Sequence, residues 1–221
     1  MIKKLRESLF ISVEGGEGVG KSTFITGLEK TLSKLGRNVI VTREPGGTLL
    51  ADRIREVFTH GSKEEPFTVE AELMLVSAAR SQHVSHLISP ALREGKMVIC
   101  DRFADSTRVY QGYLGKIDNE FMENIIDKTI YGRHPDITFL LDCDTEISQK
   151  RIHNRSLEEG QELSRYDAAA DAVHKDLREG FLFYAKKFSE RFVVLDASKN
   201  PAHVLEQALI HLEERYGFDF S

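Results

Sequence analysis

Five short runs of mostly apolar residues recur along the chain at wide spacing. They cover Leu9–Val13, Asn38–Thr42, Met97–Cys100, Ile137–Asp142 and Phe192–Leu195. Within each run, apolar residues follow one another instead of alternating with polar ones. This pattern is typical of strands whose two faces are both covered by helices. We therefore predict five buried strands in one parallel sheet.

Between these runs, apolar residues repeat at helical spacing. Gly36 is suited to end the first predicted helix, and Pro90 predicts a kink in the second, because proline lacks the N–H that a helix needs. Alternating strands and helices predict an α/β fold, a five-stranded parallel sheet flanked by helices on both faces, with ligands at the carboxyl ends of the strands. The predicted helices are Ser22–Leu35, Val69–Glu94, Asp118–Tyr131, Thr145–Asn154, Ala172–Phe188 and Pro201–Tyr216.

Composition narrows the class of protein. The 221 residues are 41% hydrophobic and 29% charged, which is ordinary for one globular domain. The net charge of −5 argues against nucleic acid or an anionic membrane as a partner. No apolar segment approaches the length of a membrane span. Cys100 and Cys143 lie in apolar runs, which favours buried, reduced thiols over a disulfide, so we expect a cytoplasmic protein.

A phosphate-binding loop lies between the first predicted strand and the first predicted helix. Residues 15–22 read Gly-Gly-Glu-Gly-Val-Gly-Lys-Ser, the pattern G-x-x-x-x-G-K-[ST]. The glycines let successive N–H groups point at phosphates, Lys21 is placed for the β- and γ-phosphates, and the Ser22 hydroxyl is placed for Mg²⁺. The pattern predicts an ATP-binding site formed by Gly15, Gly16, Glu17, Gly18, Val19, Gly20, Lys21, Ser22 and Thr23.

Charged residues follow the next two strands. Arg43 comes after the second, and Asp101 and Arg102 come after the third. Asp101 is placed to hold Mg²⁺ directly or through water. Because a guanidinium matches phosphate with two parallel hydrogen bonds, Arg43 and Arg102 together are suited to one acceptor phosphate. The chain lacks the N-K-x-D and D-x-x-G motifs of switch GTPases and an L-S-G-G-Q-like motif. Among proteins with a phosphate-binding loop, these absences favour the kinases that phosphorylate small molecules.

Residues 155–171 are polar and have no clean periodicity. One interpretation is a solvated surface loop. The other is a mobile lid, about residues 150–171, that closes over the phosphates and brings arginines into the site.

Together these motifs resemble those of thymidylate kinases, over roughly Phe10 to Asp196. The resemblance implies a P-loop NTPase fold and a single nucleoside monophosphate kinase domain over residues 1–221. It also implies Mg²⁺-dependent phosphorylation of dTMP to dTDP by ATP, in a homodimer. Besides the loop, the segments that carry the resemblance are Thr42–Thr48, Ala78–Arg80, Asp101–Gly112, Pro135–Asp142 and Arg165–Asp167.

The resemblance implies roles for the substrate residues as well. Arg43 and Arg102 would hold the 5′-phosphate of dTMP. Arg80 would bind the edge of thymine, and Glu17 would face the 3′-OH of the deoxyribose. Thr107, Tyr110 and Gln111 would line the pocket for base and sugar.

The family divides by the origin of its catalytic arginine. Some members carry arginine directly after the loop acid, where this chain has Gly18. The chain therefore resembles the bacterial type, in which the lid supplies the cation. The candidates are Arg155, then Arg151, then Arg165, and they join Lys21, Glu17 and Arg102 in the predicted catalytic set. No general base is needed, because an acceptor phosphate with a second pKa of ~6 is already largely dianionic at neutral pH.

Two positions depart from the family pattern. Val76 stands four residues before Arg80, where an aromatic usually stacks on thymine, so selectivity between dTMP and dUMP stays open; Phe67 and Met74 are candidates for the missing contact. His153 stands where bacterial lids often carry another arginine.

Two other functions compete with this interpretation. A deoxynucleoside kinase would need a carboxylate base, for which Glu17 or Asp101 could serve. A nucleotide-binding module without turnover would need a missing catalytic group. The paired arginines favour an acceptor that carries a phosphate.

Overall fold

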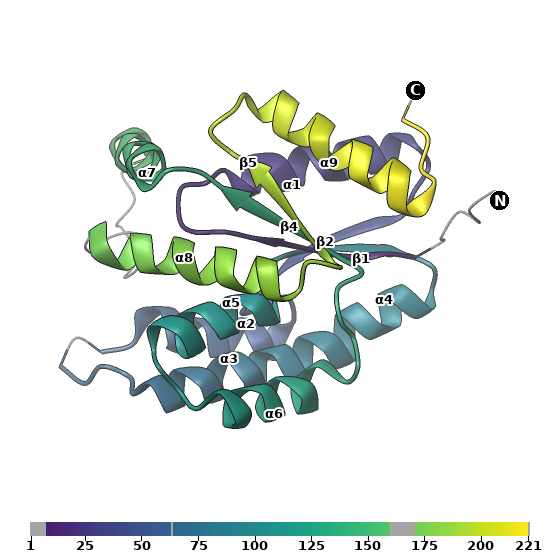
Figure 1. Cartoon of the computed structure of the whole chain (residues 1–221). Helices are drawn as coiled ribbons and strands as arrows, with labels where there is room; N and C mark the ends of the chain where they lie inside the picture. The colour runs from purple at the N-terminus through teal and green to yellow at the C-terminus, as the bar shows by residue number, and fades with distance from the viewer. Residues whose placement is uncertain (1–7, 63, 160–170, 221) are drawn as a thin grey trace.

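The computed structural model describes residues 8–62, 64–159 and 171–220. At its centre is a parallel sheet with the strand order β2–β3–β1–β4–β5 (Figure 1). The five predicted strands and the α/β fold are confirmed, and no strand end differs from its predicted position by more than one residue. The strands are β1 (Phe10–Glu14), β2 (Val39–Arg43), β3 (Met97–Asp101), β4 (Ile137–Asp142) and β5 (Phe192–Asp196).

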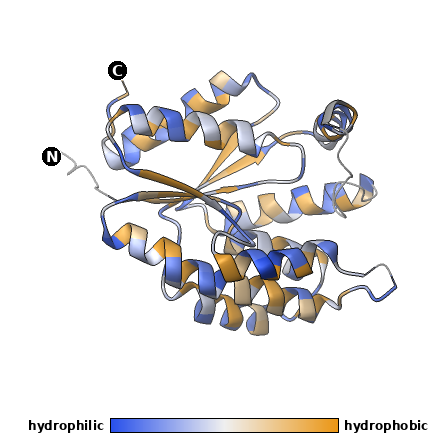
Figure 2. Cartoon of the chain, turned by 180° about the vertical axis from the view of Figure 1, so that it is seen from behind, coloured by the Kyte–Doolittle hydropathy of each residue, from blue (hydrophilic) through white to orange (hydrophobic). Residues whose placement is uncertain are grey.

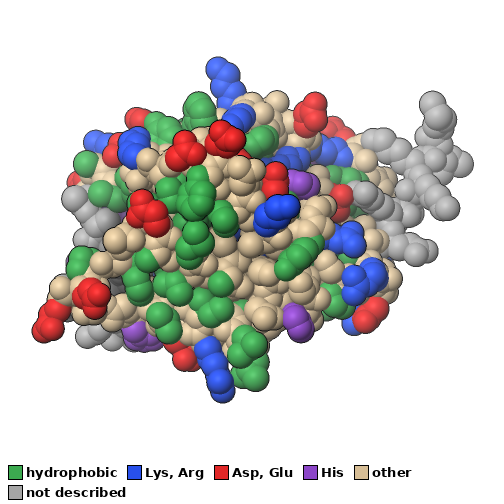
Figure 3. Space-filling view, turned by 90° about the horizontal axis from the view of Figure 1, so that it is seen from below, with side chains coloured by type: hydrophobic (Ala, Val, Ile, Leu, Met, Phe, Trp, Pro, Cys, Tyr) green, Lys and Arg blue, Asp and Glu red, His purple; other side chains and the backbone are tan. Residues whose placement is uncertain are grey.

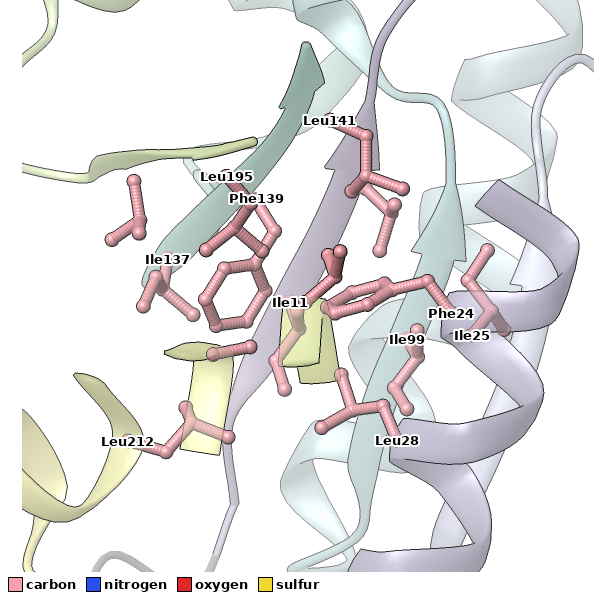
Figure 4. Close-up of a cluster of buried hydrophobic side chains, with 14 of the residues drawn as sticks. Ile11, Phe24, Ile25, Leu28, Ile99, Ile137, Phe139, Leu141, Leu195 and Leu212 are labelled. Atoms are coloured by element: carbon pink, nitrogen blue, oxygen red, sulfur yellow. The ribbon is translucent and has the colours of Figure 1, made fainter. Parts of the chain in front are cut away.

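One face of the sheet is covered by α1 (Lys21–Lys34) and α9 (Pro201–Tyr216). On β1, Ile11 and Val13 point into this layer, whereas Phe10 belongs to the core on the other face. Figure 4 shows the first cluster, in which Phe24 of α1 lies against Phe139 of β4, with ring centroids 5.6 Å apart. Fully burying such a side chain contributes about 1.5–3 kcal/mol to folding. This core fixes the position of the loop between β1 and α1.

The opposite face carries most of the remaining helices, and apolar residues concentrate in the strands and on the helix sides turned toward them (Figures 1 and 2). Among the described residues, Cys100 and Cys143 are free and buried. The elements here are α3 (Val69–His83), the π-helical turn η1 (Val84–Ile88), α4 (Ser89–Arg93), α5 (Ala104–Thr107), the π-helical segment η2 (Arg108–Leu114), α6 (Asn119–Ile130) and α8 (Asp171–Lys187).

The long helix predicted over Val69–Glu94 is divided. Regular α-helix ends at His83, η1 follows, and α4 begins at Ser89 with Pro90 in its first turn. Proline is tolerated there because the first N–H groups of a helix have no intrahelical partner. The interruption therefore falls just before Pro90.

Two helical stretches are additional to those predicted. α2 (Leu49–His60) begins at Thr48, whose hydroxyl accepts the Ala51 N–H at 3.3 Å. Residues 104–114 form α5 and η2 directly after β3. α7 (Thr145–Glu159) extends further than predicted. Across the described residues, no helix is both long and apolar enough to cross a membrane.

Candidate functional site

The phosphate-binding loop passes from the end of β1 into the first turn of α1. Gly15, Gly18 and Gly20 have positive φ angles, which glycine adopts at little cost. The Lys21 ammonium donates to the carbonyl oxygens of Gly15 at 3.2 Å and Gly16 at 2.8 Å. The lysine thus lies against the first residues of the loop, and a loop of this kind binds phosphate through its backbone N–H groups.

Glu17, Arg102 and Tyr110 form a cluster beside the loop. Arg102 donates to Glu17 Oε2 at 2.8 Å, and the Tyr110 hydroxyl donates to Oε1 at 2.9 Å. Burial by itself would raise the pKa of Glu17, but the charges of Arg102 and Lys21 outweigh it and lower the pKa to about 2. Glu17 is therefore ionised at neutral pH.

A buried chain of hydrogen bonds holds Arg80. Its Nε donates to Glu44 Oε2 at 2.8 Å, and its NH2 donates to Thr107 Oγ1 at 2.8 Å. Glu44 Oε1 lies 3.0 Å from His83 Nδ1, and His83 Nε2 lies 2.7 Å from Thr42 Oγ1. Because a carboxylate only accepts, Nδ1 carries the hydrogen, and a neutral ring then accepts from Thr42. The guanidinium is fixed in one orientation.

All seven residues predicted to bind dTMP line one cavity of about 350 Å³. Arg43 reaches it from the end of β2 with a side chain that is 60% exposed and 3.9 Å from Asp52. The predicted residues that line it are Glu17, Arg43, Arg80, Asp101, Arg102, Thr107, Tyr110, Gln111 and Arg155.

Neither Phe67 nor Met74 supplies the aromatic or apolar contact that Val76 lacks. Val76 does line the cavity, but Phe67 lines a separate hollow with Val57 and Gly61, and Met74 is exposed. Neither candidate for the missing aromatic contact is therefore in place. Phe58 of α2, which belongs to no sequence motif, lines the cavity instead.

The end of β3 fits a metal ion. Asp101 Oδ1 is buried and has no hydrogen-bond partner among the described residues. Ser22 lies in the first turn of α1 and its side chain is exposed. The described residues contain no group of three or more His, Cys, Asp or Glu side chains suited to a metal. This set fits Mg²⁺, which uses few protein ligands together with water and phosphate oxygens.

α7 packs directly on the loop. A Cβ atom added to Gly18 would lie 2.4 Å from the carbonyl oxygen of Ser148, so no side chain fits at that position. Arg151 NH1 donates to the carbonyl oxygen of Ala197 at 3.0 Å and lies 3.5 Å from that of Val19. Arg155 instead lines the acceptor cavity. Arg165, the third lid candidate, lies outside the described residues, as do residues 160–170 of the predicted lid.

The sequence did not point to several buried carboxylates around the site. Glu14 accepts the Phe103 N–H at 2.8 Å and the Ser106 hydroxyl at 2.7 Å. Burial, with the charge of Asp105, raises the pKa of Glu14 to about 7, although Arg102 opposes the shift. Only its place next to the loop could have drawn attention to it. Glu44 stands inside the Thr42–Thr48 motif, but its partners are distant in sequence.

This fold and this site define a P-loop kinase of a small acceptor. The family model for thymidylate kinase matches residues 13–208. The thymidylate kinase of Maridesulfovibrio salexigens is 40% identical over 214 residues, which are 96% of this chain and 98% of the relative. That of Chlamydia trachomatis is 40% identical over 206 residues, 92% of this chain and 98% of the relative.

A solved structure agrees. The crystal structure of thymidylate kinase from Ehrlichia chaffeensis superimposes with a TM-score of 0.71 and 31% identity, covering 93% of this chain and 98% of that one. The chain belongs to the thymidylate kinase family, whose members phosphorylate dTMP to dTDP with ATP. The predicted resemblance is confirmed.

Proposed function

We propose that this chain transfers the γ-phosphoryl group of ATP to the 5′-phosphate of dTMP, within one domain over residues 1–221. The observation that carries the proposal is the cavity in which Arg43 and Arg102 stand beside the buried Arg80. Two guanidinium groups complement the charge and geometry of a dianionic phosphate. An acceptor that ends in a neutral hydroxyl would not need them.

The acceptor base lies deeper in the same cavity. Arg80 NH1 is buried without a hydrogen-bond partner among the described residues, so it offers a free donor. Leaving such a group unpaired is costly, which makes a carbonyl oxygen of the base a favourable occupant. Thr107, Tyr110 and Gln111 line the rest of this cavity, where the base and sugar would bind. The family resemblance implies that Glu17 faces the 3′-OH.

ATP binds along the loop from Gly15 to Thr23. A second cavity of about 180 Å³, lined by Gly20, Thr23, Arg151 and Lys199, adjoins the loop and accommodates the donor's base and ribose. Ser22 and Asp101 would hold Mg²⁺, which would supply charge neutralisation at the phosphates. Lys21 contributes a second positive charge at the β- and γ-phosphates.

Catalysis then consists of positioning and charge stabilisation. Arg102 holds the acceptor phosphate, Glu17 orients Arg102, and a lid arginine faces the migrating group. Arg155 is our first choice, because it lines the acceptor cavity while Arg151 is bonded to backbone carbonyls. The obstruction at Gly18 supports a cation that comes from the lid rather than from the loop.

We propose that the active form is a cytoplasmic homodimer. Apolar side chains gather on the face formed by α2, α3 and α6 (Figure 3). They are exposed although each is large and apolar, which is typical of a surface that another molecule covers. The second copy is the occupant that the family resemblance implies. The exposed residues are Leu50, Val57, Met74, Phe121 and Tyr131.

Equilibrium binding tests the acceptor assignment. Wild-type protein should bind dTMP far more tightly than thymidine. Arg43→Ala and Arg102→Ala should each weaken dTMP binding by about 10- to 100-fold, because each removes charged hydrogen bonds to phosphate. Thymidine binding should change little in either variant. Equal losses for dTMP and thymidine would mean that these arginines do not bind the phosphate.

A further inference from the structure

Gln111 is held in one orientation by a buried carboxylate. Its side-chain nitrogen Nε2 donates to Glu72 Oε2 at 3.0 Å, and both side chains are buried. Gln111 comes from η2 and Glu72 from α3, so the contact joins two elements that flank the acceptor cavity. A carboxylate accepts hydrogen bonds and cannot donate them. Glu72 therefore faces the NH₂ end of the amide and excludes the flipped orientation.

This orientation decides what Gln111 offers to a ligand. With Nε2 turned to Glu72, the carbonyl oxygen Oε1 is left as the acceptor in a side chain that lines the cavity. In the same cavity, Arg80 NH1 is a buried donor with no partner among the described residues. The wall thus presents one acceptor and one donor.

Such a pair matches one kind of pyrimidine edge. Thymine and uracil offer an N3–H donor next to a C4 carbonyl, which complements Oε1 of Gln111 and NH1 of Arg80. Cytosine has the opposite pattern, an N3 acceptor next to a 4-amino donor. A site built to hydrogen-bond one pattern rejects the other strongly, because its buried polar groups are left unpaired.

We propose that Glu72 is a specificity-determining residue of the dTMP site, although it contacts Gln111 rather than the base. By fixing the amide, it makes the site select a base with an N3 hydrogen and reject dCMP. This inference rests on the proposed dTMP acceptor site. Glu72 acts as a positioning residue, and its removal should alter the choice of base more than the rate of phosphoryl transfer.

Glu72→Gln tests the proposal with little change in shape. A glutamine at position 72 can donate or accept, so the Gln111 amide can flip and offer its NH₂ group to N3 of cytosine. The ratio of kcat/KM for dCMP to kcat/KM for dTMP should rise about tenfold, through KM rather than kcat, as expected for one exchanged hydrogen bond. The KM for ATP should stay the same. Glu70→Gln, an exposed change on the same helix, is the matched control and should leave the ratio unchanged.

An unchanged dCMP to dTMP ratio in a folded Glu72→Gln enzyme would overturn the proposal. Folding is checked by thermal unfolding. If that variant does not fold, Gln111→Leu decides, since it removes the acceptor. It should raise the KM for dTMP about tenfold without any gain for dCMP, and an unchanged KM would overturn the proposal. Failure of wild-type protein to use dTMP at all would instead contradict the proposed function.

Discussion

At the scale of single residues, Arg102 controls the charge state of the site. Its guanidinium, together with the ammonium group of Lys21, keeps the pKa of Glu17 at about 2 against the effect of burial. A carboxyl group with so low a pKa is ionised throughout the neutral pH range. Glu17 therefore does not change its protonation state near neutral pH.

Glu17→Gln should therefore lower kcat/KM for dTMP by about 10- to 100-fold, through loss of the charged contact to Arg102. It should not shift the pH optimum. The measurement is kcat/KM between about pH 5.5 and pH 9 for wild type and variant. A limb of the wild-type profile that disappears in the variant would identify Glu17 as a general base.

The raised pKa of Glu14 predicts that its contribution to stability falls as the pH rises. A carboxyl group whose pKa is lowered by folding has the opposite dependence. Its pKa in the folded protein is about 7, above the usual 4.5, so between these values the folded state holds a proton that the unfolded state has lost. Stability from this group is complete below pH 4.5 and is lost as the pH rises through about 7. Glu14→Gln mimics the neutral form. Its free energy of unfolding relative to wild type should therefore rise by about 1–3 kcal/mol between about pH 5 and about pH 8. Urea unfolding at these two pH values measures the difference, and equal differences at both would show that Glu14 keeps an ordinary pKa.

Replacing His83 with asparagine or with glutamine should affect dTMP binding differently, because each amide can replace only one of the two hydrogen bonds of the ring. Asparagine at this position keeps a donor near Nδ1 for Glu44, whereas glutamine keeps a polar atom near Nε2 for Thr42. His83→Gln should raise the KM for dTMP about fivefold, because Glu44 then holds Arg80 less firmly, and His83→Asn should change it less than twofold. Similar KM values for both variants would assign His83 a purely structural role.

At the scale of elements, the contact between α7 and the loop is the tightest constraint near the donor site. Gly18 has a φ of 72° and its missing Cβ would meet the Ser148 carbonyl oxygen at 2.4 Å. Gly36 has nearly the same φ, 73°, but open space around it, so it is a matched control.

Gly36→Ala should cost only the backbone strain of about 1–2 kcal/mol in stability. Gly18→Ala should cost more and should also raise the KM for ATP, because α7 or the loop must move. Thermal unfolding and steady-state kinetics compare the two. Equal stability losses with an unchanged KM for ATP would show that α7 does not press on the loop.

Local signals explain which elements could be predicted. The strands and the phosphate-binding loop follow from residues adjacent in sequence, and Pro90 marks the place where the helix is interrupted. α2 carries a capping signal at Thr48, but among its residues only Ala51 is fully buried, which leaves a weak hydrophobic pattern. The bonds from Glu44 to Arg80 and His83 join residues 36 and 39 positions apart. Residue types alone do not reveal such pairs, so Glu14, Glu44, Glu72 and Phe58 escaped prediction.

At the scale of the whole molecule, the apolar face over α2, α3 and α6 predicts a dimer. Phe121 on this face and Leu35 at the end of α1, on the opposite side of the sheet, are each 40% exposed. Phe121→Glu should weaken dimerisation, because it places a charge in an apolar contact, whereas Leu35→Glu should not. Sedimentation velocity of both variants measures the change. If Phe121→Glu protein is as dimeric as wild type, the interface does not lie on this face.

The central claim is that the acceptor is the phosphate of a nucleoside monophosphate. It is tested most directly by measuring ADP release from ATP and Mg²⁺ with dTMP or with thymidine as the acceptor. The account predicts rapid turnover with dTMP and none with thymidine, because Arg43 and Arg102 need a phosphate to hold, and because Glu17 is paired with Arg102 rather than free to take a proton from a hydroxyl. Comparable turnover with thymidine would contradict it, since a carboxylate of the site, Glu17 or Asp101, would then have to act as a general base for the hydroxyl.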